Sequence, residues 1–396
     1  MSASVSGIFQ GQDIVCLATQ EWDAHWTPVQ QVMARLAPAN RVLYVEPFHA
    51  AISRLRNGNQ VFQQQIRQGV PQLREVRPNL FVYRPGYPYL PLNMKLAASH
   101  SINSKLYSRE LRSLLKKMSM DRPWLWAFFA QSLTALDIPF RHVIYDCVDD
   151  WPSFFMHSVE RRYITQIDEE LTRRADVVFV GSQPLYEKKK EHNARVYVVN
   201  HAADVPHFMK AADPATEVPA DLAVVPEPRI GFVGMIDELR FDADLIAAVA
   251  RNKHWNVVIA GGFIGGAREL IPDLPNIHVL GMKKVDQLPA YLKGMNVCLM
   301  PYRVNETTKY IFPLKLFEYL ASGKPVVATP IPAVKTVSDY VRIAATPAET
   351  VEAIGEALAE TGTAASERRI KLAKGHSWES HVDQKLRHIV RTFGGG

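Results

Sequence analysis

The sequence is poor in cysteine and has no long uninterrupted hydrophobic run, and each shortage excludes a class of protein. Only three cysteines occur in 396 residues, each in a separate apolar stretch and without zinc or disulfide spacing: Cys16, Cys147 and Cys298. We expect them to be reduced core residues of a cytosolic protein. The most apolar stretch, PWLWAFFAQSLTALDIPF, is interrupted by Gln131, Asp137 and two prolines, and a spanning helix needs roughly 20 apolar residues. It is predicted to be a buried strand with its loop.

Length and composition predict two packed domains. A chain of 396 residues is too long for one ordinary core, so we expect two units. With 47% hydrophobic and 22% charged residues, the composition is that of a globular protein rather than a disordered or fibrous one. The first residues, MSASVSGIFQGQDIV, lack the basic start and apolar run of a secretory signal, so none is expected.

Positive charge is concentrated in one part of the chain. The net charge is +6, and residues 50–120 hold two acidic side chains, Glu75 and Glu110, against twelve basic ones: Arg54, Arg56, Arg67, Arg74, Arg77, Arg84, Lys95, Lys105, Arg109, Arg112, Lys116 and Lys117. The same region contains FVYRPGYPYLPLNMKL, a mixture suited to an anionic membrane surface. Ordinary solvated helix faces would explain the charge equally well. Nucleic acid is disfavoured, because no helix-turn-helix, RNA-binding or zinc-finger pattern accompanies the charge.

Short apolar runs alternate with stretches of helical periodicity along nearly the whole chain. Seven runs precede residue 205 and six follow residue 228: DIVCLAT, RVLYVEP, NLFVYRP, PWLWAFFA, HVIYDCVDD, DVVFVGS and VYVVNHA, then RIGFVGM, NVVIAGG, NIHVLGM, VCLMPY, PVVATP and VRIAA. Most are continuously hydrophobic, as strands buried on both faces of a parallel sheet are. The pattern predicts an α/β fold with two such units.

A stretch with five prolines and no clear period, DVPHFMKAADPATEVPADLAVVPEPR, separates the two series of strands. We therefore predict an N-terminal domain of residues 1–205, a linker of residues 206–228, a C-terminal domain of residues 229–375, and a C-terminal helix with a flexible tail over residues 376–396. In that last segment, the spacing of the apolar residues is typical of an amphipathic helix.

The stretch FPLKLFEYLASGKPVVATP, residues 312–330, has the pattern of a short helix followed by a buried strand. Pro313 suits the first helical position and Gly323 the left-handed residue that ends a helix. The amino end of this helix should open at the carboxyl edge of a parallel sheet, where α/β proteins bind ligands. Free N–H groups, the helix dipole and the ammonium of Lys315 favour a phosphate there. Taken alone, Lys315 and Glu318 could also form an ordinary surface ion pair.

The same stretch resembles the donor-site segment of GT-B glycosyltransferases, closest to relatives reading P-x-K-x-x-E-Y, of the teichuronic-acid type and xanthan glucuronosyl type. Agreement extends through NRVLYVEP, VIYDCVDDW, ADVVFVGSQPLYEKKK, RIGFVGMIDELRFDADLI, NIHVLGMKKVDQLPAYLKGMNVCLMPYR and SWESHVDQKL. The resemblance implies two Rossmann-like domains facing across a cleft, with the C-terminal helix packing back on the N-terminal domain. It also implies a nucleotide sugar as co-substrate, most simply a UDP-sugar, and no metal.

By this resemblance the C-terminal domain holds the donor. Lys315 matches the lysine expected at the donor diphosphate, and Glu318 matches the residue expected at the ribose. GFVG lines the diphosphate, and the turn after NIHVLG approaches the nucleobase through its backbone. The implied donor-binding residues are Gly234, Met235, Gly281, Met282, Lys283, Tyr302, Pro313, Leu314, Lys315 and Glu318. For Met282, a place in the core is an equal alternative.

Three aspartates follow a buried strand in YDCVDDW. Carboxylates there are costly to bury without partners, so we expect them to open onto the cleft. Asp149 matches the aspartate base of the xanthan-type enzyme, and contact with Trp151 could raise its pKa into a range suited to accepting a hydroxyl proton. Asp146 and Asp150 are expected to cap the next helix or to bond backbone N–H groups. A pair of metal-binding aspartates is the third alternative.

An aromatic loop follows the first predicted strand. Thr27, Pro28 and Gln30 have the spacing of a helix start. The preceding loop carries the candidate acceptor-binding residues, whose rings could stack on a sugar: Trp22, Asp23, His25 and Trp26. For His25, an ordinary loop position without a ligand is the alternative.

Two glycine-rich turns, GFVGM and AGGFIGGA, follow predicted strands but lack G-x-G-x-x-G spacing, so an NAD enzyme is disfavoured. The sequence also departs from the family pattern. Tyr310 stands where retaining members usually have an acidic residue, Met235 and Ile236 replace an arginine often found after the glycine-rich strand, and NHAAD replaces the usual His-Gly or Asn-Gly. These changes leave the stereochemical outcome open.

The sequence therefore predicts a glycosyltransferase that moves a sugar from a nucleotide sugar to a lipid-linked saccharide or other glycan acceptor, on the cytosolic leaflet of the membrane. Asp149 would act as base, and Lys315 would stabilise charge on the leaving diphosphate. Two alternatives remain: a nucleotide-sugar 2-epimerase of the same fold, and a non-catalytic nucleotide-sugar-binding scaffold.

Overall fold

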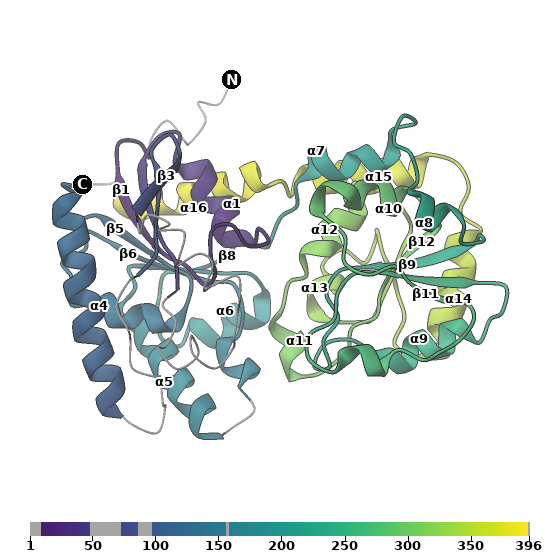
Figure 1. Cartoon of the computed structure of the whole chain (residues 1–396), viewed down its shortest axis with the longest axis horizontal. Coiled ribbons are helices and arrows are strands. Elements are labelled where there is room, and N and C mark those ends of the chain that lie inside the picture. The colour runs from purple at the N-terminus through teal and green to yellow at the C-terminus, as the bar shows by residue number, and fades with distance from the viewer. Residues whose placement is uncertain (1–8, 48–72, 86–96, 156–157, 395–396) are drawn as a thin grey trace, which may run out of the picture. The chain divides into compact units, whose positions relative to one another are not determined.

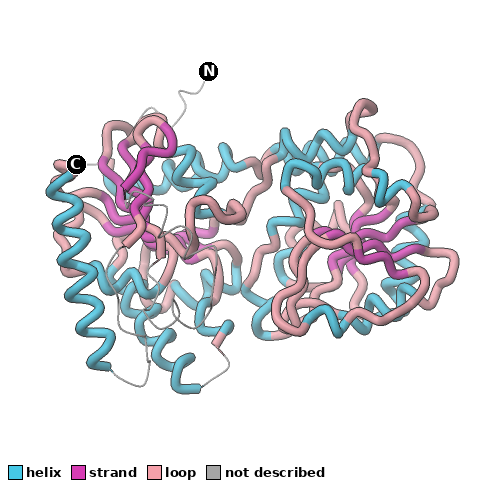
Figure 2. The backbone as a smooth tube through the Cα atoms, in the orientation of Figure 1, coloured by secondary structure: helices cyan, strands magenta, loops and turns pink. Residues whose placement is uncertain are grey.

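The computed structural model describes residues 9–47, 73–85, 97–155 and 158–394, which form two compact units (Figures 1 and 2). Unit 1 consists of residues 1–199 and 382–396, and unit 2 of residues 200–381. Much of the basic stretch singled out in the sequence, residues 48–72 and 86–96, lies outside the described residues.

Unit 1 is built on an eight-stranded sheet in the order β3–β4–β2–β1–β5–β6–β7–β8. Its strands are β1 (Asp13–Leu17), β2 (Arg41–Val45), β3 (Leu73–Arg77), β4 (Leu80–Tyr83), β5 (Trp124–Ala127), β6 (Val143–Cys147), β7 (Val177–Val180) and β8 (Val196–Val198). All neighbouring pairs are parallel except β3 and β4, which are antiparallel. Strand order reverses at β1, which lies between β2 and β5.

Helices cover both faces of this sheet, with α4, α5 and α6 on the side opposite α1 and α16 (Figure 1). The elements are α1 (Pro28–Leu36), α4 (Ala97–Lys117), η2 (Ala130–Ala135), η3 (Trp151–Phe154), α5 (Ser158–Arg174), α6 (Gln183–Lys189) and α16 (Trp378–Phe393). As the sequence predicts, α1 starts directly after Thr27, whose N–H donates to the Gln30 side chain at 3.1 Å.

Unit 2 has a six-stranded parallel sheet in the order β11–β10–β9–β12–β13–β14, which is the strand order of a Rossmann fold. Its strands are β9 (Arg229–Val233), β10 (Asn256–Ala260), β11 (Ile277–Val279), β12 (Val297–Met300), β13 (Val326–Ala328) and β14 (Arg342–Ile343). The order reverses between β9 and β12. In such sheets the crevice outside the carboxyl ends of the strands at this reversal is the ligand-binding position.

The helices of unit 2 form two apolar layers. α9 and α14 pack in one core and α10, α12 and α15 in the other. The elements are α7 (Val205–Phe208), η4 (Met209–Ala212), α8 (Ala220–Ala223), α9 (Ala243–Ala250), η5 (Ala267–Leu270), η6 (Val285–Gln287), α10 (Leu288–Lys293), α11 (Glu306–Tyr310), α12 (Leu314–Ala321), α13 (Pro332–Lys335), α14 (Pro347–Leu358) and α15 (Ala364–Lys374). The proline-rich segment contributes α7, η4 and α8, and its Phe208 and Leu222 are buried in the core of unit 2.

The thirteen predicted strands are all present, since each apolar run contains one. The structure adds β3, a short edge strand reading LREVR, which is too charged to be recognised by apolar character. All three cysteines are buried and free, as expected. The predicted C-terminal helix is α16, whose Val382, Leu386 and Ile389 lie in the core of unit 1, so the prediction that it packs back on the N-terminal domain is confirmed.

Candidate functional site

The carboxyl end of β9 meets the first turn of α12 at the strand reversal of unit 2. β9 ends at Val233 and is followed by Gly234, while α12 begins after α11, the short helix that follows β12. The Lys315 side chain reaches Gly234 so closely that an added Cβ there would lie 2.8 Å from the ammonium nitrogen. Gly234 also has φ +138°, a backbone conformation that side chains rarely adopt. The backbone conformation therefore favours glycine here, and a larger residue would also displace the Lys315 ammonium.

Aromatic rings rather than carboxylates surround the Lys315 ammonium. Its nitrogen lies 4.4 Å from the ring centroid of Phe232 and 5.4 Å from that of Tyr302. No carboxylate of the described residues is within salt-bridge distance of it, so the alternative of a Lys315–Glu318 ion pair is not what the structure shows. A cation held over ring faces keeps its charge available to an anion.

Tyr319 fixes the direction of α12, one turn beyond Lys315. Its hydroxyl accepts a hydrogen bond from the Val233 N–H at 2.7 Å and donates to the Val233 carbonyl at 3.2 Å. Because residues four apart share a helix face, the contact that holds Tyr319 on β9 also directs Lys315 at Gly234. The helix ends as predicted, with Gly323 at φ +75°, whereas Pro313 is the residue just before the first turn and not its first residue.

Glu318 lies on the same helix and is only partly exposed. Burial raises the pKa of this carboxyl to about 7, against the opposing attraction of the nearby Lys315. A carboxylate that is poorly solvated gains from a hydroxyl donor, such as those of a ribose. The geometry therefore offers a cation and a hydrogen-bond acceptor three residues apart on one helix.

Two exposed methionines converge beside a second glycine turn. An added Cβ at Gly262 would lie 3.0 Å from the Met235 sulfur and 3.4 Å from the Met282 Cε. Met282 is 67% exposed and Gly281 has φ +74°, so the alternative of a core position for Met282 is wrong. Neighbouring Gly261 approaches Gly234 still more closely, because a Cβ there would overlap the Gly234 carbonyl oxygen.

The remaining donor candidates play different parts in the structure. The Lys283 ammonium is engaged with Asp221 at 2.7 Å, and Asp221 also accepts from the Tyr291 hydroxyl. Partial burial of the Asp221 carboxyl acts to raise its pKa, but the hydrogen bonds from Lys283 and Tyr291 outweigh burial and lower the pKa of Asp221. Tyr302 is buried and its ring faces Lys315, while Pro313 and Leu314 form the start of α12. The Lys283 side chain thus holds α8 through Asp221.

In unit 1, the three aspartates of YDCVDDW have different environments. Asp146 is buried, accepts from the Trp126 indole at 3.0 Å and pairs with Lys385 of α16. Asp150 is buried and pairs with Lys188 at 2.6 Å. The expectation that all three open onto a cleft is therefore wrong for these two, and their structural role is ion pairing with no side-chain capping bond. Asp149 is half-buried, and its carbonyl accepts from the Trp151 N–H at 3.1 Å.

The candidate acceptor residues lie in the loop after β1. Trp22 is buried, with its ring 5.2 Å from those of Trp26 and Tyr44, so it supports the loop from within. Asp23 is exposed and pairs with Arg74. His25 is exposed, and partial desolvation lowers its pKa. Trp26 is half-buried and is partly covered by the Arg77 guanidinium, 4.9 Å from its ring centroid.

A small cavity of about 90 Å³ opens at the strand reversal of unit 1. Its lining comes from the carboxyl ends of β1 and β2 and from the segment after β5, and includes Thr19, Glu46 and Ser132. Glu46 is fixed by two donors, the Trp22 N–H at 3.0 Å and the Arg84 Nε at 2.7 Å. This is the carboxyl edge, where the sequence predicted acceptor binding.

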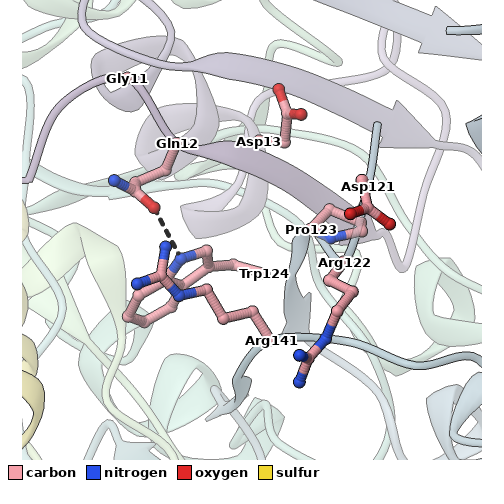
Figure 3. Close-up of a pocket in the computed structure, with 8 residues that line it drawn as sticks. All are labelled: Gly11, Gln12, Asp13, Asp121, Arg122, Pro123, Trp124 and Arg141. Carbon is pink, nitrogen blue, oxygen red and sulfur yellow. Dashed lines mark hydrogen bonds between the residues drawn. The ribbon is translucent and has the colours of Figure 1, made fainter. Parts of the chain in front are cut away.

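A larger cavity of about 300 Å³ lies at the opposite, amino edge of the same sheet (Figure 3). Its lining includes Gln12, Asp13 and Trp124, and the Trp124 indole donates to the Gln12 side chain at 3.0 Å. Its position is remote from the carboxyl ends of the strands, so size alone does not mark the functional edge. No group of three or more His, Cys, Asp or Glu suited to a metal occurs in the described part of the chain.

Comparison with known proteins bears on unit 2 first. Residues 227–361 match the family model described as Glycosyl transferases group 1. This segment therefore resembles a group 1 glycosyltransferase domain. The matched segment contains β9 to β14 and α12, and hence Gly234, Lys315 and Glu318.

A relative and two solved structures extend the comparison. TuaH of Bacillus subtilis strain 168, provisionally named a teichuronic acid biosynthesis glycosyltransferase, is 26% identical over 269 residues, 62% of this chain and 66% of that protein. The match thus spans slightly less than two thirds of TuaH. Sucrose-phosphate synthase of Thermosynechococcus elongatus aligns over 97% of this chain and 100% of its own with TM-score 0.67 and 15% identity. HepE of Anabaena, solved with UDP and glucose, aligns over 96% and 99% with TM-score 0.62 and 14% identity.

These likenesses confirm the GT-B fold with two Rossmann-like domains and the predicted resemblance to GT-B glycosyltransferases. They do not assign a role to any residue. The structure adds three residues of the candidate site that the sequence did not single out. They are Phe232, whose ring faces the Lys315 ammonium, Tyr319, which anchors α12, and Gly261, which packs closely against Gly234. Tyr319 stands four residues after Lys315, and that spacing was the available signal.

Proposed function

We propose that the protein transfers a sugar from a UDP-sugar to a lipid-linked glycan acceptor during the synthesis of a cell-surface polysaccharide. The observation that carries the proposal is the Lys315 ammonium held at Gly234, at the strand reversal of a group 1 glycosyltransferase domain. The relatives support the substrate class, since TuaH is named for teichuronic acid biosynthesis and HepE was solved with UDP.

In the proposed mechanism, unit 2 binds and activates the donor. The amino end of α12 and Lys315 hold the diphosphate, Glu318 accepts hydrogen bonds from the ribose, and the turns around Gly234, Met235 and Gly281 to Lys283 enclose the nucleotide. When the bond between the anomeric carbon and the diphosphate oxygen breaks, negative charge develops on the leaving oxygen. An ammonium already in position stabilises that charge without reorganisation.

The acceptor half of the reaction belongs to unit 1. The cavity that includes Thr19 and Ser132 and the loop of Trp22, Asp23, His25 and Trp26 would receive the acceptor sugar. Asp149 would take the proton from the attacking hydroxyl, and its half-buried position suits a carboxylate that must be basic and accessible. The donor residues Tyr302, Pro313 and Leu314 complete the diphosphate end of the site in this scheme.

The proposed location is the cytoplasmic face of the membrane, with peripheral attachment. A lipid-linked acceptor would be reached there, and the excess of cations in residues 50–120 would favour an anionic surface. Within the described residues, no helix combines the length and apolar character needed to cross a bilayer.

Calorimetry with UDP and a panel of UDP-sugars tests the proposal on Lys315→Ala. Loss of a charge-assisted contact worth about 1.5–3 kcal/mol should weaken donor binding by about ten- to a hundredfold. Lys371→Ala removes an exposed lysine of α15 and should bind as the wild type does. Equal affinity in Lys315→Ala and the wild type would refute the site. Donor conversion without any acceptor, followed by NMR, would point instead to a 2-epimerase.

A further inference from the structure

α4 carries a straight stripe of cations on its outward face. Lys105, Arg109, Arg112 and Lys116 recur at intervals of four, three and four residues, and all four are exposed. At about 100° per residue, these intervals keep the four side chains within about 60° of arc, over a length of about 16 Å. The helix runs along one side of unit 1 (Figure 1).

The opposite face of α4 is fully used in packing. Tyr107, Leu111, Leu114 and Leu115 are buried against unit 1. Glu110, the only acidic residue in the sequence of the helix, is also buried and accepts a hydrogen bond from the Tyr83 hydroxyl at 2.6 Å. Its carboxylate is therefore turned away from the exposed cations.

The cations of the stripe have no salt-bridge partner among the residues that the structure describes. Arg112 donates to the main-chain carbonyl of Asp137 at 2.7 Å, and no carboxylate lies within salt-bridge distance of Lys105, Arg109 or Lys116. By contrast, Arg173 of α5 and Lys188 of α6 are each paired with an acid. Unpaired positive charge is thus concentrated on one straight surface.

We propose that α4 docks on an anionic phospholipid bilayer through the stripe defined by Lys105, Arg109, Arg112 and Lys116. Each cation near such a surface strengthens adsorption, and the effects add for a straight row that can approach a plane together. At the amino end, Ile102 is 46% exposed on the same face and can enter the interfacial layer. This inference rests on the proposed function, because it assigns the peripheral attachment proposed there to one helix face.

A bilayer fits the stripe better than nucleic acid does. The stripe lies on a single helix, whereas single-stranded nucleic acid is held in a positively charged groove with aromatic side chains for base stacking. Its exposed neighbour on this face is aliphatic Ile102, and Tyr107, the aromatic residue of α4, is buried. The exposed chemistry of the face is therefore cationic and aliphatic.

Vesicle co-sedimentation of the full chain tests the proposal. Vesicles of phosphatidylcholine with about one-third phosphatidylglycerol should bind the protein, and vesicles of phosphatidylcholine alone should not. Removing one cation should weaken partitioning about fivefold, so the triple variant Lys105→Gln, Arg109→Gln, Lys116→Gln should lose about a hundredfold. Binding should also weaken as salt is raised.

The matched control removes the same charge from α5. Arg161, Arg162 and Arg174 are exposed, and the triple change to Gln there should leave vesicle binding within a fewfold of the wild type. Equal loss in both triple variants, or no binding by the wild type, would overturn the docking of α4, as would tighter binding to single-stranded DNA than to the anionic vesicles. UDP affinity measured on the same variants separates the donor site from the membrane contact, because a protein that binds UDP but ignores vesicles refutes this inference and the peripheral attachment while leaving the proposed donor site intact.

Discussion

Gly234 and Lys315 illustrate how much of the proposed site depends on the absence of one methyl group. Replacing Gly234 by Ala would set a Cβ 2.8 Å from the Lys315 nitrogen, so the ammonium must move. We expect Gly234→Ala to lose donor affinity at least tenfold in calorimetry with UDP. Gly362→Ala is the control, because Gly362 also has a positive φ, +81°, with no atom within 4 Å of an added Cβ. Both variants place an alanine at a positive φ, so a loss of UDP affinity in Gly234→Ala alone would assign the effect to this site, and equal affinities would contradict it.

The carboxyl of Glu318 predicts a pH dependence with a defined sign. Its pKa in the folded protein is raised to about 7, above the value near 4.5 of the unfolded chain, so folding binds a proton. The free energy of unfolding therefore falls as pH rises from about 4.5 to about 7, and the loss is complete above that. Glu318→Gln should be more stable than the wild type at pH 8, by on the order of 1–3 kcal/mol, and equally stable near pH 4. Denaturant titration at several pH values measures this difference.

Ionisation of Glu318, which lowers the stability of the fold, should strengthen donor binding. If the ionised carboxylate accepts hydrogen bonds from ribose, UDP affinity should rise between about pH 6 and pH 8 in the wild type and stay flat in Glu318→Gln. A variant that gained stability yet kept the full pH dependence of UDP binding would assign the ribose contact to another residue.

Among the elements, α12 is aligned by one phenol hydroxyl. Tyr319→Phe removes both hydrogen bonds to Val233 and leaves a buried N–H without an acceptor. Such a loss costs about 1–3 kcal/mol, which should lower the melting temperature and weaken UDP binding together. Tyr340→Phe, in the segment before β14, removes a hydroxyl for which the described residues provide no hydrogen bond, and should change neither. A normal UDP affinity in Tyr319→Phe would show that packing alone directs Lys315.

Strands that are buried on both faces were predictable from the sequence. Side-chain contacts between residues far apart in the sequence were not. Continuous apolar runs such as VVFV identify strands because a parallel sheet is covered on both faces. β3 was not predicted, because this edge strand carries charged residues and has no apolar run. Lys315 was recognisable from helix signals close by, but Tyr319 looks like any core aromatic until its contact with Val233 is known. Asp146 was misjudged because Lys385, its partner, lies 239 residues away.

For the whole molecule, the buried pair of Lys385 and Asp146 joins the last helix to the sheet of unit 1. Lys385→Met should destabilise unit 1 by about 3–5 kcal/mol, because it leaves a buried carboxylate uncompensated. The double variant Lys385→Met, Asp146→Asn removes that charge and should recover a large part of the loss, since the Asn oxygen can still accept from Trp126. Urea unfolding of both variants measures the coupling. Equal destabilisation in the single and double variants would mean that packing of the Lys385 stem, not its charge, is what matters.

The placement of α16 also constrains the order of events at the ribosome. Unit 2 is one continuous stretch, residues 200–381, whereas unit 1 needs residues 382–393 to fill its core. Synthesis of unit 1 therefore begins first, but its core can be completed only after unit 2 has been translated. During synthesis, the apolar surface that receives Val382, Leu386 and Ile389 stays uncovered until α16 has been made, which makes the nascent chain a natural client for chaperones that shield hydrophobic patches.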